Sequence, residues 1–217
     1  MATLKFLGTD SGFGQKNNSA YCEENGKFIL IDCGFTVFHI IKEKFDFNKY
    51  SEIDIIITHL HNDHAGSLSQ VILYLWFAYN KKVNIISNCK HIKEYLEITG
   101  TLKEAYEIKT SFPNLTFIST SHVKELDAYG FKIKLNNRNI IYTGDTATLE
   151  PFLPYLPSAD EFYTDSSRYG GVHPKIDDII DKLENYKSLD VYLMHINDEK
   201  FIRNLVGNKF NFASDLM

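Results

Sequence analysis

The sequence has little cysteine and no long hydrophobic run, and each shortage excludes a class of protein. Its three cysteines among 217 residues form no C-x-x-C pair, which argues against a disulfide-stapled secreted scaffold and favours a reducing compartment. The longest apolar run, Val71 to Tyr79, is far shorter than the roughly 20 residues that a membrane-spanning helix needs. The N-terminus shows no basic segment followed by an apolar one. We therefore expect a cytoplasmic protein without membrane contact.

Positive charge is in the minority. The 23 Lys and Arg residues are outnumbered by 28 Asp and Glu residues, which gives a net charge of −5 at pH 7. Extended nucleic acid is bound through many phosphate contacts from Lys and Arg, so this balance disfavours such a partner. A small-molecule partner is favoured instead.

Proline and glycine are too few and too scattered to mark an interdomain linker. The chain contains 5 Pro and 12 Gly, and it shows neither a low-complexity tract nor a repeat at a solenoid period. We expect residues 1–217 to form a single domain.

Strand-like and helix-like segments alternate along the chain, which is typical of an α/β fold. An early hairpin is expected to turn at Asn25-Gly26, a residue pair that type I′ turns prefer. Helices are expected over Leu68 to Tyr79, around His91 to Ile98 and from Ile176 to Tyr186. Further strands are expected at "LKFLG", "VNIIS", "LTFIS", "FKIKL", "NIIYTG", "DEFYTD" and "DVYLMH".

Three segments share a pattern in which a buried-type strand ends in a residue able to bind metal. These residues are His59, Asp165 and His195, each five positions after an aspartate. Strand ends of this kind can converge on one edge of a sheet sandwich, and we expect the functional site at that edge.

The stretch "THLHNDHAGSL" contains three of the chain's eight histidines. If the preceding strand continues through it, His59 and His61 point to the same side, because side chains alternate faces with period two. Asp63 and His64 would open the next helix and diverge, which suits a second ion beside the first. Structural histidines would rarely cluster so densely at a strand-to-helix junction.

Here the sequence resembles the metallo-β-lactamase superfamily, whose H-x-H-x-D-H motif is matched by His59, His61, Asp63 and His64. Further family segments follow in order along nearly the whole chain, namely "FLGT", "LIDCG", "YTGDT" and "LMHI". The resemblance implies an αββα sandwich, with two mixed sheets flanked by helices and a dinuclear metal site at one edge. It implies two divalent ions, with Zn²⁺ expected and Mn²⁺ or Fe as alternatives.

Carried over position by position, the resemblance implies three more ligands. His122 would be the third protein ligand of the first ion, Asp145 would bridge both ions, and His195 would complete the second. Neutral imidazoles suit Zn²⁺, and a shared carboxylate can hold two ions about 3.5–4 Å apart. Asp32 matches an acidic residue of the family that supports the site without binding metal.

Within the superfamily, "LKFLGTDSG", "NNSAY" and "HVKELDAYGFKI" resemble the ribonuclease Z-like phosphodiesterase branch. The Gly/Pro-rich arm with which ribonuclease Z clamps tRNA is not visible, and the net charge also disfavours tRNA. We therefore expect hydrolysis of a small phosphodiester such as a cyclic nucleotide. The alternatives are a tRNA 3′-processing-type endoribonuclease, a thioesterase or lactonase on the same fold, and a non-catalytic metal-binding protein.

Two residues are expected to act in the reaction itself. Asp63 would orient the attacking hydroxide as well as bind metal, since Zn²⁺ lowers the pKa of bound water to about 7. His173 loosely matches a histidine that ribonuclease Z-like enzymes carry beside the site, and as a general acid it would protonate the leaving oxygen. Pro174 departs from the family pattern, so His173 could instead only orient the helix that follows. Arg168 could meet a phosphate oxygen or be a plain loop residue.

The segment "SLSQVILYLWFAYNKK" is apolar nearly all round, which is typical of deep burial. Because it directly follows the histidine motif near one edge of the fold, we predict a homodimer through this face.

Overall fold

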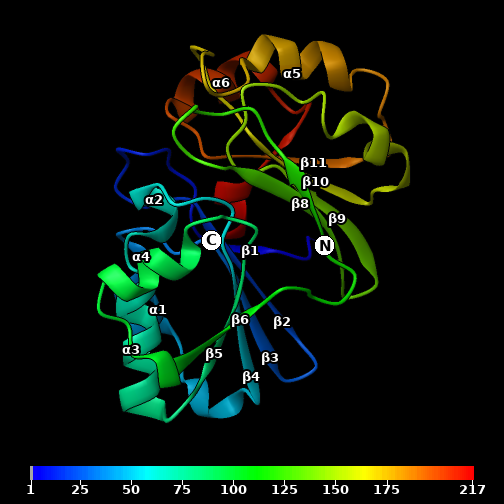
Figure 1. Cartoon of the computed structure of the whole chain (residues 1–217). Coiled ribbons are helices and arrows are strands. Elements are labelled where there is room, and N and C mark those ends of the chain that lie inside the picture. The colour runs from blue at the N-terminus through cyan, green and yellow to red at the C-terminus, as the bar shows by residue number, and fades with distance from the viewer. Residues whose placement is uncertain (1) are drawn as a thin grey trace.

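Two β-sheets pack face to face, and helices cover the outer side of each sheet (Figure 1). This computed structural model describes residues 2–217. Over those residues, twelve strands divide equally between the two sheets. The arrangement is the predicted αββα sandwich, and the fold class is confirmed.

The strands follow one another in two consecutive sets. The first sheet contains β1 (Lys5–Gly8), β2 (Ser19–Glu24), β3 (Lys27–Ile31), β4 (Glu52–Ile56), β5 (Val83–Ile86) and β6 (Tyr106–Lys109). The second contains β7 (Thr116–Ser119), β8 (Tyr129–Leu135), β9 (Arg138–Tyr142), β10 (Glu161–Asp165), β11 (Asp190–Met194) and β12 (Asn211–Phe212). The helices are α1 (Val37–Lys44), α2 (Asn62–Ala65), α3 (Leu68–Tyr79), α4 (Ile92–Ile98), α5 (Ile176–Leu183) and α6 (Glu199–Val206). The 3₁₀ helices are η1 (Phe47–Lys49), η2 (Lys103–Ala105), η3 (Leu153–Ser158) and η4 (Ala213–Leu216).

Each sheet begins with antiparallel strands and continues with parallel ones. The β2–β3 hairpin turns at Asn25 and Gly26, with φ of 51° and 77°, and the β8–β9 hairpin turns at Asn136 and Asn137, with φ of 45° and 67°. Two central residues with positive φ are what a type I′ turn requires. From β3 to β6 and from β9 to β12 the pairing is parallel, so the carboxyl ends of these strands share one edge in each sheet.

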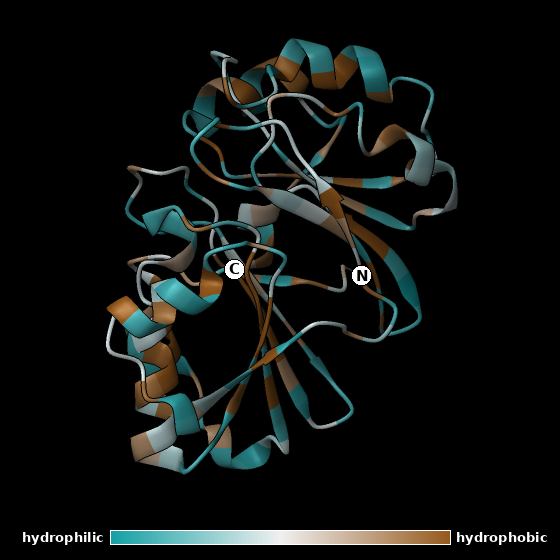
Figure 2. Ribbon diagram, viewed as in Figure 1, coloured by the Kyte–Doolittle hydropathy of each residue, from teal (hydrophilic) through white to brown (hydrophobic). Residues whose placement is uncertain are grey.

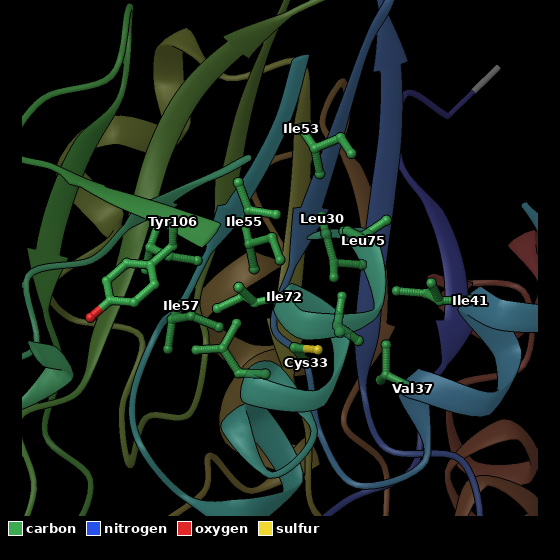
Figure 3. Packing of buried hydrophobic residues seen from close by; sticks show 14 of the residues in the cluster. Leu30, Cys33, Val37, Ile41, Ile53, Ile55, Ile57, Ile72, Leu75 and Tyr106 are labelled. Atoms are coloured by element: carbon green, nitrogen blue, oxygen red, sulfur yellow. The ribbon is translucent and has the colours of Figure 1, made fainter. Parts of the chain in front are cut away.

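Three layers of apolar side chains hold the sandwich together. One lies between the sheets and combines Phe6, Ile29 and Ile56 with Phe131 and Tyr142. The other two lie between each sheet and its helices. Figure 3 shows the layer between the first sheet and its helices α1 and α3. Figure 2 shows the hydrophobic colouring concentrated along the strands.

The predicted elements are largely present, with differences at their ends. Helix α3 has the predicted bounds, whereas α5 ends at Leu183 rather than Tyr186, and α1 and β6 had no sequence signal that we used. Strand β4 ends at Ile56, so the continuation of this strand through His59 and His61 is wrong. None of the helices within residues 2–217 combines the length and apolar character needed to cross a bilayer.

Candidate metal centre

The candidate site lies where parallel strands end. His59 follows β4, Asp145 follows β9, Asp165 is the last residue of β10 and His195 follows β11. Asp165 Oδ1 lies 3.3 Å from His195 Nδ1, and Asp145 Oδ2 lies 3.8 Å from His59 Nε2. The predicted convergence of strand ends is thus confirmed, with both sheets contributing.

The first group of side chains contains His59, His61, His122 and Asp145. One ligand atom from each lies within 4.8 Å of all the others. His61 Nδ1 is 3.0 Å from His59 Nε2 and 3.2 Å from His122 Nε2. Asp145 Oδ2 is 3.8 Å from His59 Nε2 and 3.6 Å from His122 Nε2. Three imidazoles and one carboxylate therefore face one point, although His59 and His61 lie in a loop rather than on a strand.

The second group contains Asp63, His64, Asp145 and His195, with ligand atoms again within 4.8 Å of one another. His64 Nε2 lies 3.2 Å from Asp145 Oδ1, 3.3 Å from Asp63 Oδ2 and 3.4 Å from His195 Nε2. Asp63 and His64 belong to the short helix α2, as predicted. Their side chains do not diverge as expected, because Asp63 Oδ2 and His64 Nε2 lie 3.3 Å apart in the same group. Asp145 faces the first group with Oδ2 and the second with Oδ1, which is the arrangement that a bridging carboxylate needs.

Four of the five histidines are oriented by oxygen atoms behind them. With Nε2 facing inward, the outer Nδ1 of each lies against an oxygen. The pairs are His59 with Thr58 Oγ1 at 3.1 Å, His64 with Asp32 Oδ2 at 2.9 Å, His122 with the Val172 carbonyl at 3.1 Å, and His195 with Asp165 Oδ1 at 3.3 Å. Such partners fix the ring orientation and increase the basicity of the inner nitrogen, as they do around protein-bound metals.

These side chains fit divalent cations. Among residues 2–217, Asp145 Oδ1 is one of a few buried side-chain atoms without a hydrogen-bond partner, although it faces the imidazole of His64. Ring nitrogens and carboxylate oxygens converge at 3.0–3.8 Å with too few protons to satisfy them all. Imidazole and carboxylate are the ligands that Zn²⁺ and similar ions take.

Asp32 supports the second group from the loop after β3. It is fully buried, and its carboxylate accepts hydrogen bonds from the Thr58 amide at 2.9 Å, from the Thr58 hydroxyl and from His64 Nδ1 at 2.9 Å. Its φ of 60° lies in the left-handed region, which Asp tolerates better than most residues. His195 has a similar φ of 53°. Strained backbone of this kind persists where the surrounding contacts over-determine it.

His173 lies beside both groups and is held by a carboxylate that sequence reasoning had flagged only as a strand end. Its Nδ1 donates to Asp165 Oδ2 at 2.8 Å and lies 4.0 Å from Asp145 Oδ2. Asp165 is fully buried and also contacts His195, so it links the proposed acid to a ligand candidate. Asp145, Asp165, His173 and His195 form a third cluster of potential ligand atoms, which makes His173 a competing ligand as well as an acid candidate.

Burial and the local carboxylates divide the histidines into two classes. Burial lowers the pKa of His59 well below 6.5 and also lowers the pKa of His61, so both rings are neutral at pH 7. Burial opposes charge on His64 and His195 too, but the Asp145 carboxylate outweighs it. The pKa of His64 is raised well above 6.5 and that of His195 to about 10. A metal ion that bound at the second group would therefore displace protons, and its affinity would fall as the pH falls.

A cavity of about 540 Å³ opens onto both groups. It is lined by Ser11, Gly12, Phe13, Phe35, His61, Asn62, Asp63, His122, Val123, Asp145, Ser167, Val172, His173, His195 and Asn197. This lining contains no Lys or Arg among the described residues. Arg168 lies outside it, because its guanidinium donates to Asp198 at 2.9 Å and covers the ring of Phe201. Of the two alternatives for Arg168, a phosphate contact or a plain loop residue, these contacts favour the loop residue.

Known proteins are similar to this chain in sequence and in fold. A family model described as "Anti-Pycsar protein Apyc1" matches residues 2–111. The anti-Pycsar protein Apyc1 of Bacillus phage 010DV004 is 28% identical over an alignment 232 positions long, gaps included, which covers 90% of this chain and 89% of that protein. Among solved structures, the metallo-β-lactamase fold protein YhfI from Bacillus subtilis superposes with a TM-score of 0.78 at 16% identity, covering 96% of this chain and 93% of that one.

Human tRNase Z, short form, superposes with a TM-score of 0.74 at 15% identity, covering 99% of this chain and 97% of that one. These structural likenesses show the sandwich fold that the resemblance to the metallo-β-lactamase superfamily implied. Because the matched family model spans half of the sequence, the chain belongs to the Apyc1 family of anti-Pycsar proteins.

Proposed function

We propose that this protein is a dinuclear metal-dependent phosphodiesterase, that its substrate is a small phosphodiester, and that cyclic nucleotides are the substrate class. The division of the Asp145 carboxylate between two ligand groups, 3.2 Å from His64 and 3.6 Å from His122, carries this proposal. It is supported by the anti-Pycsar activity for which the relatives are named. The lining without Lys or Arg supports a single phosphodiester over a polyanion such as tRNA.

The proposed ligands are the seven side chains of the two groups. When bound, two divalent ions supply a nucleophile at neutral pH and neutralise charge on the phosphate. Asp63, whose pKa is held low by hydrogen bonds from His195 and His64 despite burial, stays ionised and orients the attacking oxygen. His173 gives its Nε2 proton to the leaving oxygen as the P–O bond breaks, while Asp165 holds Nδ1.

A substrate panel tests the activity. Cyclic mononucleotides, bis(p-nitrophenyl) phosphate, pre-tRNA and a thioester are offered to the enzyme loaded with Zn²⁺, Mn²⁺ or Fe. We expect the cyclic mononucleotides to have the highest kcat/KM. Faster cleavage of the thioester than of every phosphodiester refutes the proposal. Preference for pre-tRNA would instead support the alternative, a tRNA 3′-processing-type endoribonuclease.

Substrates with different leaving groups test whether His173 acts as a general acid. The variant His173→Ala should retain both metals, lose about 10²–10⁴-fold in rate on a poor alcohol leaving group, and hardly change with p-nitrophenolate. The exposed His39 on α1 provides the matched control, His39→Ala. Loss of a metal in His173→Ala would make it a ligand, and equal loss on both substrates would assign it to phosphate binding.

The homodimer remains a prediction. Helix α3 buries Leu68, Val71, Ile72 and Leu75 against its own sheet and leaves Phe77 73% exposed, so only its outer side is available to a second copy. A monomer mass in solution across micromolar concentrations would refute the prediction.

A further inference from the structure

Two phenylalanine rings lie at the mouth of the metal-site cavity instead of in the core. Phe13 is fully exposed and Phe35 is 56% exposed, yet both line the cavity that holds Asp63 and His61. Exposed aromatic rings on the wall of a site are unfavourable in water unless a ligand covers them, so rings concentrated at a binding site indicate a partly apolar ligand.

Phe35 is held in place by the backbone of the histidine motif. A Cβ on Gly34 would lie 1.9 Å from the Asp63 carbonyl oxygen, so this glycine permits the loop after β3 to pack against α2. A Cβ on Gly66 would lie 2.7 Å from Cδ1 of Phe35, so the absent side chain there makes room for the ring. The Cys33 amide also donates to the His64 carbonyl, at 2.6 Å. The ring of Phe35 therefore lies directly beside the end of α2, the helix that carries Asp63 and His64.

Phe13 comes from a different loop, which also approaches Asp63. The loop between β1 and β2 is closed by the Asp10 amide, which donates to the Lys16 carbonyl at 2.9 Å, and is tied to the His195 segment by the Ser11 amide, which donates to the Ile196 carbonyl. A Cβ on Gly12 would lie 3.4 Å from Asp63 Oδ2, so Phe13 follows directly on the residue that touches the site.

The other side chains that line the cavity restrict the class of ligand that can bind there. No Lys or Arg is among the described residues that line the cavity, so the charged part of a substrate would have to be bound by the two ligand groups. The rest of the substrate would then face Phe13, Phe35, Val123 and Val172. We infer that Phe35, with Phe13, forms an aromatic subsite that takes the planar base of a nucleoside phosphodiester. This inference rests on the proposed phosphodiesterase function and names its specificity-determining residues.

The test compares two substrates that differ only in the base. One is a 3′,5′-cyclic nucleotide, and the other is the 3′,5′-cyclic phosphate of methyl riboside. Removing a stacking aromatic typically weakens base binding about 5- to 150-fold. We expect Phe35→Ala to lose that factor in kcat/KM on the nucleotide, mainly through KM, and to leave the baseless substrate unchanged. Phe13→Ala should act in the same direction.

Further variants separate stacking from simple hydrophobic contact. Phe35→Trp should retain the preference for the base, whereas Phe35→Leu, which keeps an apolar side chain, should lose most of it. Ile98→Ala removes an exposed apolar side chain outside both the cavity and the predicted dimer face, and it serves as the matched control. Equal loss on both substrates in Phe35→Ala, or full activity of Phe35→Leu on the nucleotide, would overturn the inference.

A binding measurement keeps this test independent of the proposed activity. If the enzyme cleaves neither substrate with any metal, the phosphodiesterase proposal fails. The aromatic subsite is then tested by calorimetry with a nucleoside 5′-monophosphate and ribose 5-phosphate. Tighter binding of the nucleotide, abolished in Phe35→Ala, supports the subsite, and equal affinities for the two compounds refute it.

Discussion

Replacing Asp32 by asparagine should weaken one of the two metal positions selectively. The carboxylate accepts hydrogen bonds from His64 Nδ1 and from the amide and hydroxyl of Thr58, and it is fully buried. Asparagine preserves the shape and tolerates the φ of 60°, but it removes the charge and turns an NH₂ group toward one of these donors. The variant therefore tests the charge rather than the packing.

The expected magnitude follows from the contact with His64. Losing a hydrogen-bond partner of a ligating histidine typically costs 10–100-fold in metal affinity, which is about 1.4–2.7 kcal/mol. His64 belongs to the group with Asp63 and His195, so the loss should fall on that ion. The ion held by His59, His61 and His122 should change less, because Asp32 reaches this group only indirectly, through the Thr58 hydroxyl that contacts His59 Nδ1.

Competition with a chromogenic chelator measures both affinities in one titration. Asp54→Asn is the matched control, because Asp54 is also a buried aspartate that hydrogen-bonds a neighbouring side chain, Asn84, at 2.7 Å, and it belongs to neither ligand group. Equal weakening of both ions in Asp32→Asn, or no weakening, would show that the hydrogen bond to His64 does not tune the metal.

Two further substitutions probe the same centre. Asp145→Ala should lower occupancy at both positions by elemental analysis, and retention of both ions would remove Asp145 from the bridging role. Gly171→Ala should cost about 1–2 kcal/mol of loop stability, because Gly171 has a φ of 90° that L-residues avoid. Since the next residue, Val172, accepts from His122, kcat/KM should fall while the urea midpoint of the whole protein hardly moves; an unchanged kcat/KM would contradict this.

Local turn chemistry explains why much of the fold could be read from the sequence. The Asn25-Gly26 pair determines its hairpin through backbone conformations that few other residues adopt. Helix α3 combines an apolar face with Asn80, in a left-handed conformation, at its C-cap, so its bounds were predictable. Helix α1 has eight residues and no side-chain hydrogen bond at its N-cap, Thr36, and it forms because Val37 and Ile41 pack onto the sheet.

The candidate ligands were predictable where they lie in one short motif. The oxygen atoms that orient them were not predictable where they come from distant parts of the sequence. The Val172 carbonyl that orients His122 is 50 residues away in sequence, and any residue could supply it. The contact of Asp165 with His195 spans 30 residues and depends on the pairing of two parallel strands. The strand-continuation argument for His59 and His61 was wrong, yet the rings still converge, because the loop after β4 is constrained by the contact of Thr58 with Asp32.

Asp165→Asn should shift the pH dependence of the reaction toward lower pH. Burial disfavours the charged form of His173, but the hydrogen bond and charge of Asp165 outweigh this and raise its pKa above 6.5. A group whose folded pKa is raised is fully protonated below its ordinary pKa and loses its proton as the pH rises through the raised value. If His173 is the acid, activity on an alcohol leaving group declines through that window above pH 6.5.

Without the charge of Asp165, the pKa of His173 is set by burial, which lowers it, and by the smaller effects of Asp145 and His195. The alkaline limb of Asp165→Asn should therefore begin at lower pH. Because Asp165 also contacts His195, rates are measured at saturating metal and divided by the metal bound at each pH. The p-nitrophenolate substrate is the internal control, since its departure needs no proton and its alkaline limb should not move. An unchanged limb on the alcohol substrate, or equal shifts on both substrates, would mean that the proton lost in that window belongs to a group other than His173.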